Sequence, residues 1–112
     1  MEAKIILLAE GEKVFADRLC KTLHEAQYKV DLALDCSIAR QMFNLHNYDL
    51  VLIDLRLSDK DGFELCSYIK HQESEIPLMM LSGNSDERKL EALETGADDY
   101  LVLTEDLREL LL

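Results

Sequence analysis

Four short, almost continuous apolar runs are spaced along the chain, and each is followed by a stretch in which apolar residues recur every three or four positions. The runs cover residues 4–9, 49–54, 76–81 and 99–103, whereas a fifth segment, residues 28–34, alternates apolar with polar or small residues. Continuous runs are typical of parallel strands buried on both faces, and alternation is typical of an edge strand with one wetter face. The pattern therefore predicts five strands, each followed by a helix.

Signals at the helix ends agree with this arrangement. Asp61 precedes the third helix and Glu64 comes three residues later, which is the spacing of a capping box. Asn84 and Glu87 have the same spacing before the fourth helix, and Gly96 suits the C-terminal end of that helix. Strict alternation of strand and helix implies right-handed crossovers and a doubly wound sheet with helices on both faces. In such a sheet, ligands bind at the carboxyl ends of the strands.

The length and charge of the chain limit how many domains it can form and what it can bind. With 112 residues, it is long enough for one three-layer core and too short for two, so we expect a single domain over residues 1–112. A formal net charge of -11 opposes direct binding to nucleic acid or to an anionic membrane surface. No apolar run spans a bilayer and no secretory signal opens the chain, so we predict a cytoplasmic protein. Three leucines end the last predicted helix, residues 104–112, which suits the N-terminal part of a longer protein.

The three cysteines lack any C-x-x-C spacing, which favours reduced thiols over a disulfide framework. Cys20 and His24 are four residues apart and can share one face of a helix. Because two ligands do not make a zinc site, we interpret them as a packing cysteine and a surface histidine.

Polar residues stand where three of the predicted strands end. Glu10 follows the first run, Asp54 ends the second, and Ser82 follows the third. Because the carboxyl ends of parallel strands meet at one edge of a sheet, we expect these side chains to gather there. Together they supply some of the partners that a phosphorylatable carboxylate needs.

These motifs resemble the receiver domain of bacterial response regulators over essentially the whole chain. The matching runs are Lys-Ile-Ile-Leu-Leu-Ala-Glu at residues 4–10, Asp-Leu-Arg-Leu-Ser-Asp-Lys-Asp-Gly at 54–62, Leu-Ser-Gly at 81–83 and Gly-Ala-Asp-Asp-Tyr-Leu at 96–101. The resemblance implies an α/β fold, a flavodoxin-like three-layer sandwich with a five-stranded parallel sheet in the order 2-1-3-4-5. It also implies a signalling module of a two-component or phosphorelay pathway that is not itself an enzyme.

The resemblance assigns roles to particular residues. Asp54 would be the phospho-acceptor, Ser82 would contact the phosphoryl group, and Tyr100 would be the aromatic ring whose rotation reports phosphorylation. Mg²⁺ would be held by Asp54, by the backbone carbonyl of Arg56 and, through water, by Glu10. Structural interpretations stand beside these: Ser82 as a turn or capping hydroxyl, and Tyr100 as a ring packed against the fourth helix.

Three departures from the family pattern weaken the expected chemistry. Gly11 occupies the position of a direct metal-binding acid, Leu103 occupies the position of a lysine, and Thr104 replaces a proline that follows a cis peptide bond. We therefore expect weak or absent Mg²⁺ binding and a trans Leu103–Thr104 peptide, with Thr104 capping the last helix. Glu12 can replace the missing acid only by bending inward, and its preferred interpretation is an acid that opens the first helix.

The preferred function is a degenerate receiver, or pseudo-receiver, with impaired aspartyl phosphorylation. It would act by binding a histidine kinase, an output domain or another protein through the fourth helix, fifth strand and fifth helix. A homodimer is also possible from the sequence. The alternative is a working receiver in which Glu10 and Glu12 bind the metal ion and a histidine kinase phosphorylates Asp54. A small hydrolase or flavin protein on the same fold is disfavoured, because Arg56 stands where a dehalogenase-type phosphatase needs a carboxylate, and Glu10 and Glu12 would repel a flavin phosphate.

Overall fold

The computed structural model of the protein describes residues 3–55, 57, 62–82 and 89–102. Within this part of the chain, strands and helices alternate strictly, as the sequence predicts. The strands are β1 (Ile5–Ala9), β2 (Lys29–Ala33), β3 (Leu50–Asp54), β4 (Leu78–Ser82) and β5 (Asp99–Val102). The helices are α1 (Lys13–Glu25), α2 (Cys36–Leu45), α3 (Gly62–Gln72) and α4 (Lys89–Glu94).

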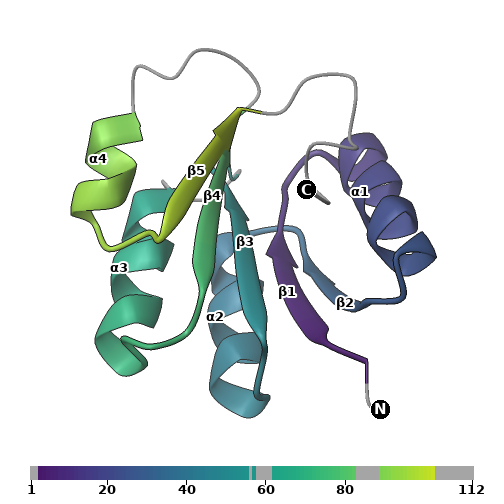
Figure 1. Ribbon diagram of the computed structural model, residues 1–112, viewed down its shortest axis with the longest axis horizontal. Coiled ribbons are helices and arrows are strands. Elements are labelled where there is room, and N and C mark those ends of the chain that lie inside the picture. Colours follow the sequence, from purple (N-terminus) through teal and green to yellow (C-terminus); the bar gives the residue numbers. More distant parts are fainter. Residues whose placement is uncertain (1–2, 56, 58–61, 83–88, 103–112) are drawn as a thin grey trace.

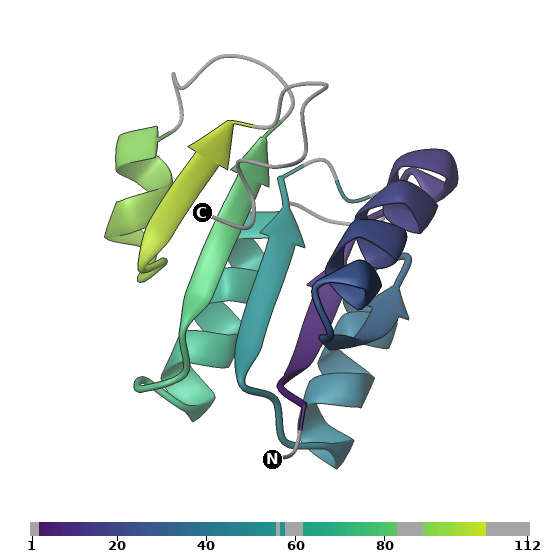
Figure 2. The same cartoon turned by 45° about the vertical axis from the view of Figure 1, so that its right-hand side comes forward.

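All neighbouring strands pair in parallel, in the order β2-β1-β3-β4-β5. The predicted order is therefore confirmed, and β2 lies at an edge, where Lys29 and Asp31 are exposed and Val30 and Leu32 are half-buried. The arrowheads of β3, β4 and β5 end at one edge of the sheet, the upper edge in Figure 2. This is the edge at which parallel sheets bind ligands.

Helices cover both faces of the sheet, with α1 on one face and α2 and α3 on the other (Figure 1, Figure 2). Alternate strand residues point to opposite faces, so the sheet separates two hydrophobic clusters. The cluster under α1 contains the buried residues Ile6, Leu8, Leu19, Leu23, Leu52 and Leu81. The larger cluster, under α2, α3 and α4, includes Leu7, Ala9, Ala39, Val51, Ile53, Leu65, Ile69, Met80 and Ala92.

Two helices end in the left-handed turn that closes many helices. At the end of α4, the N–H of Ala97 bonds to the carbonyl of Ala92 (3.3 Å), and Gly96 has φ 110°, as its position in the sequence predicts. A Cβ atom at Gly96 would also lie 3.3 Å from Cγ of Lys70. At the end of α1, Gln27 takes the equivalent position with φ 73°, a conformation in which a non-glycine residue is uncommon.

Several predicted boundaries shift or lie outside the described residues. β4 begins two residues after the predicted start, since Ile76 precedes Pro77, which has no N–H to give to a ladder. Leu34 was expected to continue the alternation of β2, but it lies beyond the last strand residue and is 38% exposed. The predicted caps at Asp61 and Asn84 and the last helix are outside the described part. No helix within the described part is long and apolar enough to cross a bilayer.

Candidate functional site

The three polar residues predicted to gather at the strand ends do gather there. Glu10 follows β1, Asp54 ends β3 and Ser82 ends β4, on three neighbouring strands of the sheet. The register pairs Ala9 with Ile53 and Asp54 with Leu81, which brings the three positions to nearly the same level. Asp54 is 0% exposed, Glu10 1% and Ser82 8%, so the carboxylates and the hydroxyl lie beneath the surface of this edge.

The loop from β1 to α1 fixes the two glutamates in different ways. Oε1 of Glu10 accepts a hydrogen bond from the N–H of Glu12 (3.1 Å). Glu12 is the N-cap of α1, and its carboxylate accepts from the N–H of Phe15 (2.7 Å) and the N–H of Val14 (3.2 Å). An acid here is favourable because the first N–H groups of a helix carry partial positive charge. Glu12 therefore has the capping position that the sequence favours, and its side chain is directed to the helix.

Two of the three acids in the family pattern are present to hold a Mg²⁺ ion, Glu10 and Asp54. Mg²⁺ needs near-octahedral oxygen ligands, usually one or two carboxylates completed by water or substrate oxygens. Glu10 and Asp54 are the buried acids of the described part, and Gly11 between Glu10 and the cap offers no side-chain oxygen. Within the described ranges, no group of three acidic, histidine or cysteine side chains could hold a metal ion. The carbonyl of Arg56 lies outside those ranges.

Tyr100 lies in the middle of β5 with its ring directed into the protein. It is 6% exposed and belongs to the cluster that also contains Ala92 of α4 and Ala97. Its backbone N–H bonds to Oδ1 of Asp99 (2.8 Å). The ring therefore packs beside the fourth helix in this structure, while its part in switching stays a prediction. Leu103 and Thr104 lie outside the described residues.

Gly62, at the first position of α3, packs against the backbone of Asp54. A Cβ atom there would lie 2.8 Å from the carbonyl oxygen of Asp54 and 3.2 Å from Cα of Leu55. The next backbone N–H, that of Leu55, bonds to the carbonyl of Leu81 (3.0 Å). The absence of a side chain at Gly62 thus allows α3 to approach the end of β3, which helps to position Asp54. Sequence reasoning placed Gly62 in the acceptor loop without giving it this role.

Asp98 is a second structural residue, to which sequence reasoning assigned no role of its own. One oxygen, Oδ2, accepts hydrogen bonds from the N–H of Leu78 (2.8 Å) and from Nζ of Lys70 (3.1 Å), which also bonds to the carbonyl of Ile76 (2.8 Å). These contacts join the end of α3 to the starts of β4 and β5. They lie at the sheet edge opposite the strand ends, so they stabilise the scaffold rather than form the site.

Cys20 and His24, the pair considered as metal ligands, lie in α1 rather than at the strand ends. Cys20 is half-buried and packs against the cluster under α1, where burial first and then the nearby Asp17 raise the pKa of its thiol. His24 is exposed. Cys66 is buried, and desolvation raises the pKa of its thiol although a hydrogen bond with Thr95 acts in the opposite direction. Because both pKa values are raised, the thiols of Cys20 and Cys66 are neutral and contribute to packing.

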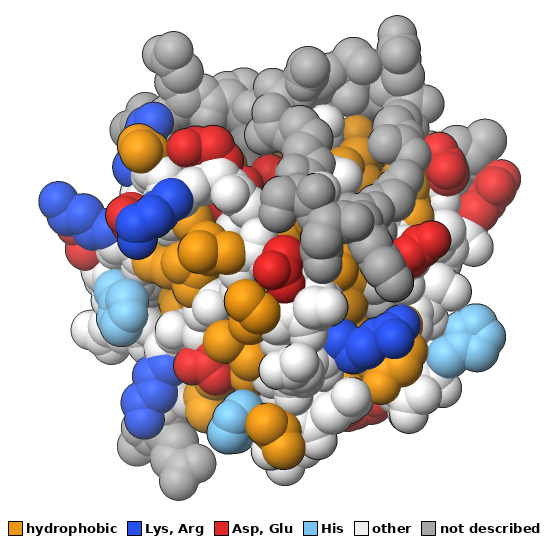
Figure 3. All heavy atoms as spheres, turned by 180° about the vertical axis from the view of Figure 1, so that it is seen from behind, with side chains coloured by type: hydrophobic (Ala, Val, Ile, Leu, Met, Phe, Trp, Pro, Cys, Tyr) orange, Lys and Arg blue, Asp and Glu red, His pale blue; other side chains and the backbone are white. Residues whose placement is uncertain are grey.

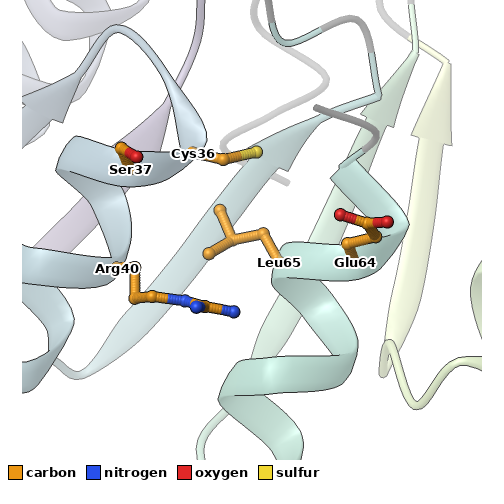
Figure 4. A pocket seen from close by; sticks show the side chains of 5 residues that line it. All are labelled: Cys36, Ser37, Arg40, Glu64 and Leu65. Atoms are coloured by element: carbon orange, nitrogen blue, oxygen red, sulfur yellow. The ribbon is translucent and has the colours of Figure 1, made fainter. Parts of the chain in front are cut away.

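A pocket opens between α2 and α3, and Glu10, Asp54 and Ser82 are not among its lining residues. It is lined by Cys36, Ser37, Arg40, Glu64 and Leu65. Figure 4 shows the Cys36 and Leu65 side chains directed into the space between the helices and Arg40 extending from α2 toward α3. The guanidinium carbon of Arg40 lies 4.0 Å from the centroid of the Tyr68 ring, a cation–π contact that joins the two helices.

Comparisons with known proteins agree with this geometry. Residues 6–112 match the family model of the response regulator receiver domain. The chain is 36% identical over 107 residues to response regulator ArlR of Staphylococcus aureus, a match that covers 95% of this chain and 48% of ArlR. The chain thus spans about half the length of the curated relatives it matches.

Solved structures give the same result. Response regulator protein TrrA from Thermotoga maritima, determined in complex with Mg(2+)-BeF, is 28% identical, with a TM-score of 0.89 over 96% of this chain and 93% of TrrA. Chemotaxis response regulator CheY4 of Vibrio cholerae is 25% identical, with a TM-score of 0.90 over 98% of this chain and 94% of CheY4. These similarities confirm the predicted flavodoxin-like sandwich and a regulatory module of two-component signalling. The chain therefore belongs to the response regulator receiver domain family.

Proposed function

We propose that this chain is a receiver module in which Asp54 accepts phosphate poorly and which signals by binding a protein partner. The observation that carries the proposal is the arrangement of the loop after β1. Gly11 supplies no carboxylate, and both oxygens of Glu12 are hydrogen-bonded at the start of α1. For Glu12 to turn toward Asp54, α1 would have to lose its cap, which typically costs about 1 kcal/mol.

The electrostatics of phosphoryl transfer support the same conclusion. An anionic phosphoryl donor approaching Asp54 meets two buried carboxylates, because Glu10 directly follows the neighbouring strand β1. Positioned cations must offset this repulsion. The family position of the lysine holds Leu103, and the position of the second metal acid holds Gly11. Each lost charge-assisted contact is worth roughly 1.5–3 kcal/mol, so the loss of two slows the reaction by several orders of magnitude.

The proposal is tested with a small-molecule phosphodonor, Mg²⁺ and the mass of the intact protein. We expect no adduct on the natural chain and a phosphoryl adduct on the Gly11→Asp, Leu103→Lys double variant. Asp54→Asn in both backgrounds is the control that assigns the adduct to its residue. A stoichiometric adduct on Asp54 of the natural chain would defeat the proposal of a degenerate receiver.

A working phospho-acceptor is the second candidate, and a specific observation favours it. The acceptor, one acid and the hydroxyl, Asp54, Glu10 and Ser82, are gathered at one edge of the sheet, and the related TrrA was determined with Mg(2+)-BeF. In this candidate, Glu10 and Asp54 bind Mg²⁺ weakly and a cognate kinase supplies the remaining contacts. Rapid transfer from the histidine kinase to the natural chain, abolished by Asp54→Asn, would support it over the degenerate receiver.

The partners proposed for this module are proteins. A histidine kinase and an output region are the candidates, since the curated relatives are about twice as long as this chain. The proposed contact surface is α4, β5 and the fifth helix, on which Leu93 of α4 is 40% exposed. The net charge of -11 supports a module that makes no direct contact with nucleic acid. Leu93→Glu should weaken partner binding, measured by calorimetry, without changing the fold.

A further inference from the structure

The outer side of α2 carries apolar side chains that no other described element covers. Leu45 is 76% exposed and Ile38 is 38% exposed, with the exposed Gln41 between them. Their spacing of three and four residues places them on one side of a helix, and Leu34, 38% exposed, lies just before it. Figure 3 views this side of the protein, where patches of hydrophobic side chains extend from left of centre to the lower middle, with acidic side chains beside them. We call Ile38, Gln41 and Leu45 the α2 face.

The α2 face is unusual in a chain of net charge -11, because α2 contains no acidic residue. The other described helices each carry at least one acid, among them Asp17 in α1, Glu64 in α3 and Glu91 in α4. The one charged residue of α2, Arg40, extends toward α3 and lies over the ring of Tyr68 (Figure 4). The α2 face itself is therefore uncharged.

The acids that flank α2 in the sequence are engaged within the protein. Asp35 caps the helix by accepting from the N–H of Ile38 (2.8 Å). Asp31 accepts from the hydroxyl of Tyr48 (2.7 Å), and Asp49 accepts from a backbone N–H at the start of β1 (2.8 Å). These hydrogen bonds hold each carboxylate against its own subunit, which leaves the α2 face available for an apolar contact.

We propose that a second copy of this chain covers the α2 face, with the two α2 helices packed antiparallel about a twofold axis. Most of the surface of a strongly acidic chain repels its own copy, whereas the three residues of the α2 face bring no charge into the contact. The antiparallel arrangement also sets the positive end of each helix dipole beside the negative end of the other. A basic partner protein would instead be attracted to the acidic helices.

The twofold axis fixes which residues meet. A symmetric interface requires reciprocal contacts, so Ile38 packs against Leu45 of the partner subunit, and Leu45 against Ile38 of the partner subunit. Gln41, halfway between them, lies near the axis and faces Gln41 of the partner subunit. The two phospho-acceptor edges then lie far from each other, and the dimer requires neither phosphate nor metal.

The size of the face sets the strength of the contact. A helix of 10 residues is about 15 Å long, so the buried area lies at the small end of specific interfaces. We therefore expect a dimer that dissociates on dilution through the micromolar range. Sedimentation of the full chain should show a mass that rises with concentration toward twice the monomer mass of 12.9 kDa.

Matched variants test the location of the contact. Leu45→Glu places a carboxylate on the α2 face of both copies and should weaken dimerisation at least tenfold. The same change at Val14, a 68% exposed residue of α1, is the control and should leave it unchanged. Far-UV circular dichroism checks that both variants are folded. A natural chain that stays monomeric at millimolar concentration, or equal effects of the two variants, overturns the proposal.

Disulfide trapping tests the antiparallel geometry separately. Gln41→Cys places two thiols across the proposed axis, so mild oxidation should give a covalent dimer in higher yield than Lys21→Cys, an exposed control on α1. The natural chain measures the background, which should be low because Cys36 and Cys66 are buried and Cys20 is half-buried. Equal yields from the two variants overturn the twofold contact at Gln41, even where the protein dimerises.

Discussion

The structure assigns Glu12 as the N-cap of α1 rather than as a metal ligand. Replacing Glu12 by alanine tests this assignment directly. Glu12→Ala removes the acceptors of two N–H groups at the start of α1, at 2.7 and 3.2 Å. Loss of an N-cap side chain costs about 1 kcal/mol, and loss of an anion from the positive end of the helix dipole costs about 0.3–1 kcal/mol. We therefore expect the free energy of unfolding to fall by about 1–2 kcal/mol, which lowers Tm by roughly 5–10 °C for a domain of this size.

Urea denaturation followed by circular dichroism measures this change, with three comparison variants. Glu12→Asp keeps a short acid that caps helices well and should stay close to the natural chain. Glu12→Gln keeps one acceptor oxygen without charge, so it should lose about half as much stability. Glu25→Ala makes the same truncation at the other end of α1, where a carboxylate has no cap to form, and should change little. If Glu12→Ala leaves stability unchanged but abolishes Mg²⁺-dependent phosphorylation, Glu12 is a metal ligand and the reasoning about the cap is wrong.

Three further predictions concern the residues that hold the scaffold. Asp98→Ala leaves the N–H of Leu78 (1% exposed) without its acceptor and should cost about 1–3 kcal/mol, whereas Asp98→Asn, which keeps an acceptor, should cost less; urea titration compares them. Gly62→Ala forces a methyl group to 2.8 Å from the Asp54 carbonyl and should cost about 1–3 kcal/mol, with faster hydrogen exchange at the end of β3 as the local readout. Burial, and then its hydrogen bond to a β2 carboxylate, raise the pKa of Tyr48, so the folded state favours the neutral phenol. This contribution to stability is present below the unfolded pKa of about 10 and declines as the pH rises above it, so Tyr48→Phe should flatten the loss of stability between about pH 9 and 11.

The fold was predictable because its signals are local and repeated. Each apolar run identifies a strand, the alternation in residues 28–34 identifies β2 as the edge strand, and Gly96 marks the end of α4. The order of the strands came from the resemblance to a family, since local patterns do not specify which strands pair. Gln27 shows the limit of such signals, because nothing in its type predicts φ 73°.

The site was predictable as a set of positions but not as a set of contacts. Parallel strands that end at one edge are sufficient to bring Glu10, Asp54 and Ser82 together. The close approach of Gly62 to Asp54 depends on how α3 docks, and the bond from Asp98 to Leu78 joins positions 20 residues apart. Such distances depend on tertiary packing, which the spacing of residues in one sequence does not encode.

The phosphorylation chemistry at the strand ends can be lost while the fold is kept, because the residues needed for that chemistry differ from the residues that stabilise the fold. Gly11 belongs to neither hydrophobic cluster, so exchanging an acid for glycine there alters the charge of the site and leaves the packing of the sheet intact. Gly62 and Asp98, in contrast, position backbone groups, and their loss would affect folding whether or not phosphate ever arrives. A chain under selection only for protein contact would keep Gly62, Asp98 and the Glu12 cap while its metal acid and lysine positions drift. Gly11 and Leu103 stand at these two positions, which supports the proposal that the chain binds a partner without efficient phosphorylation.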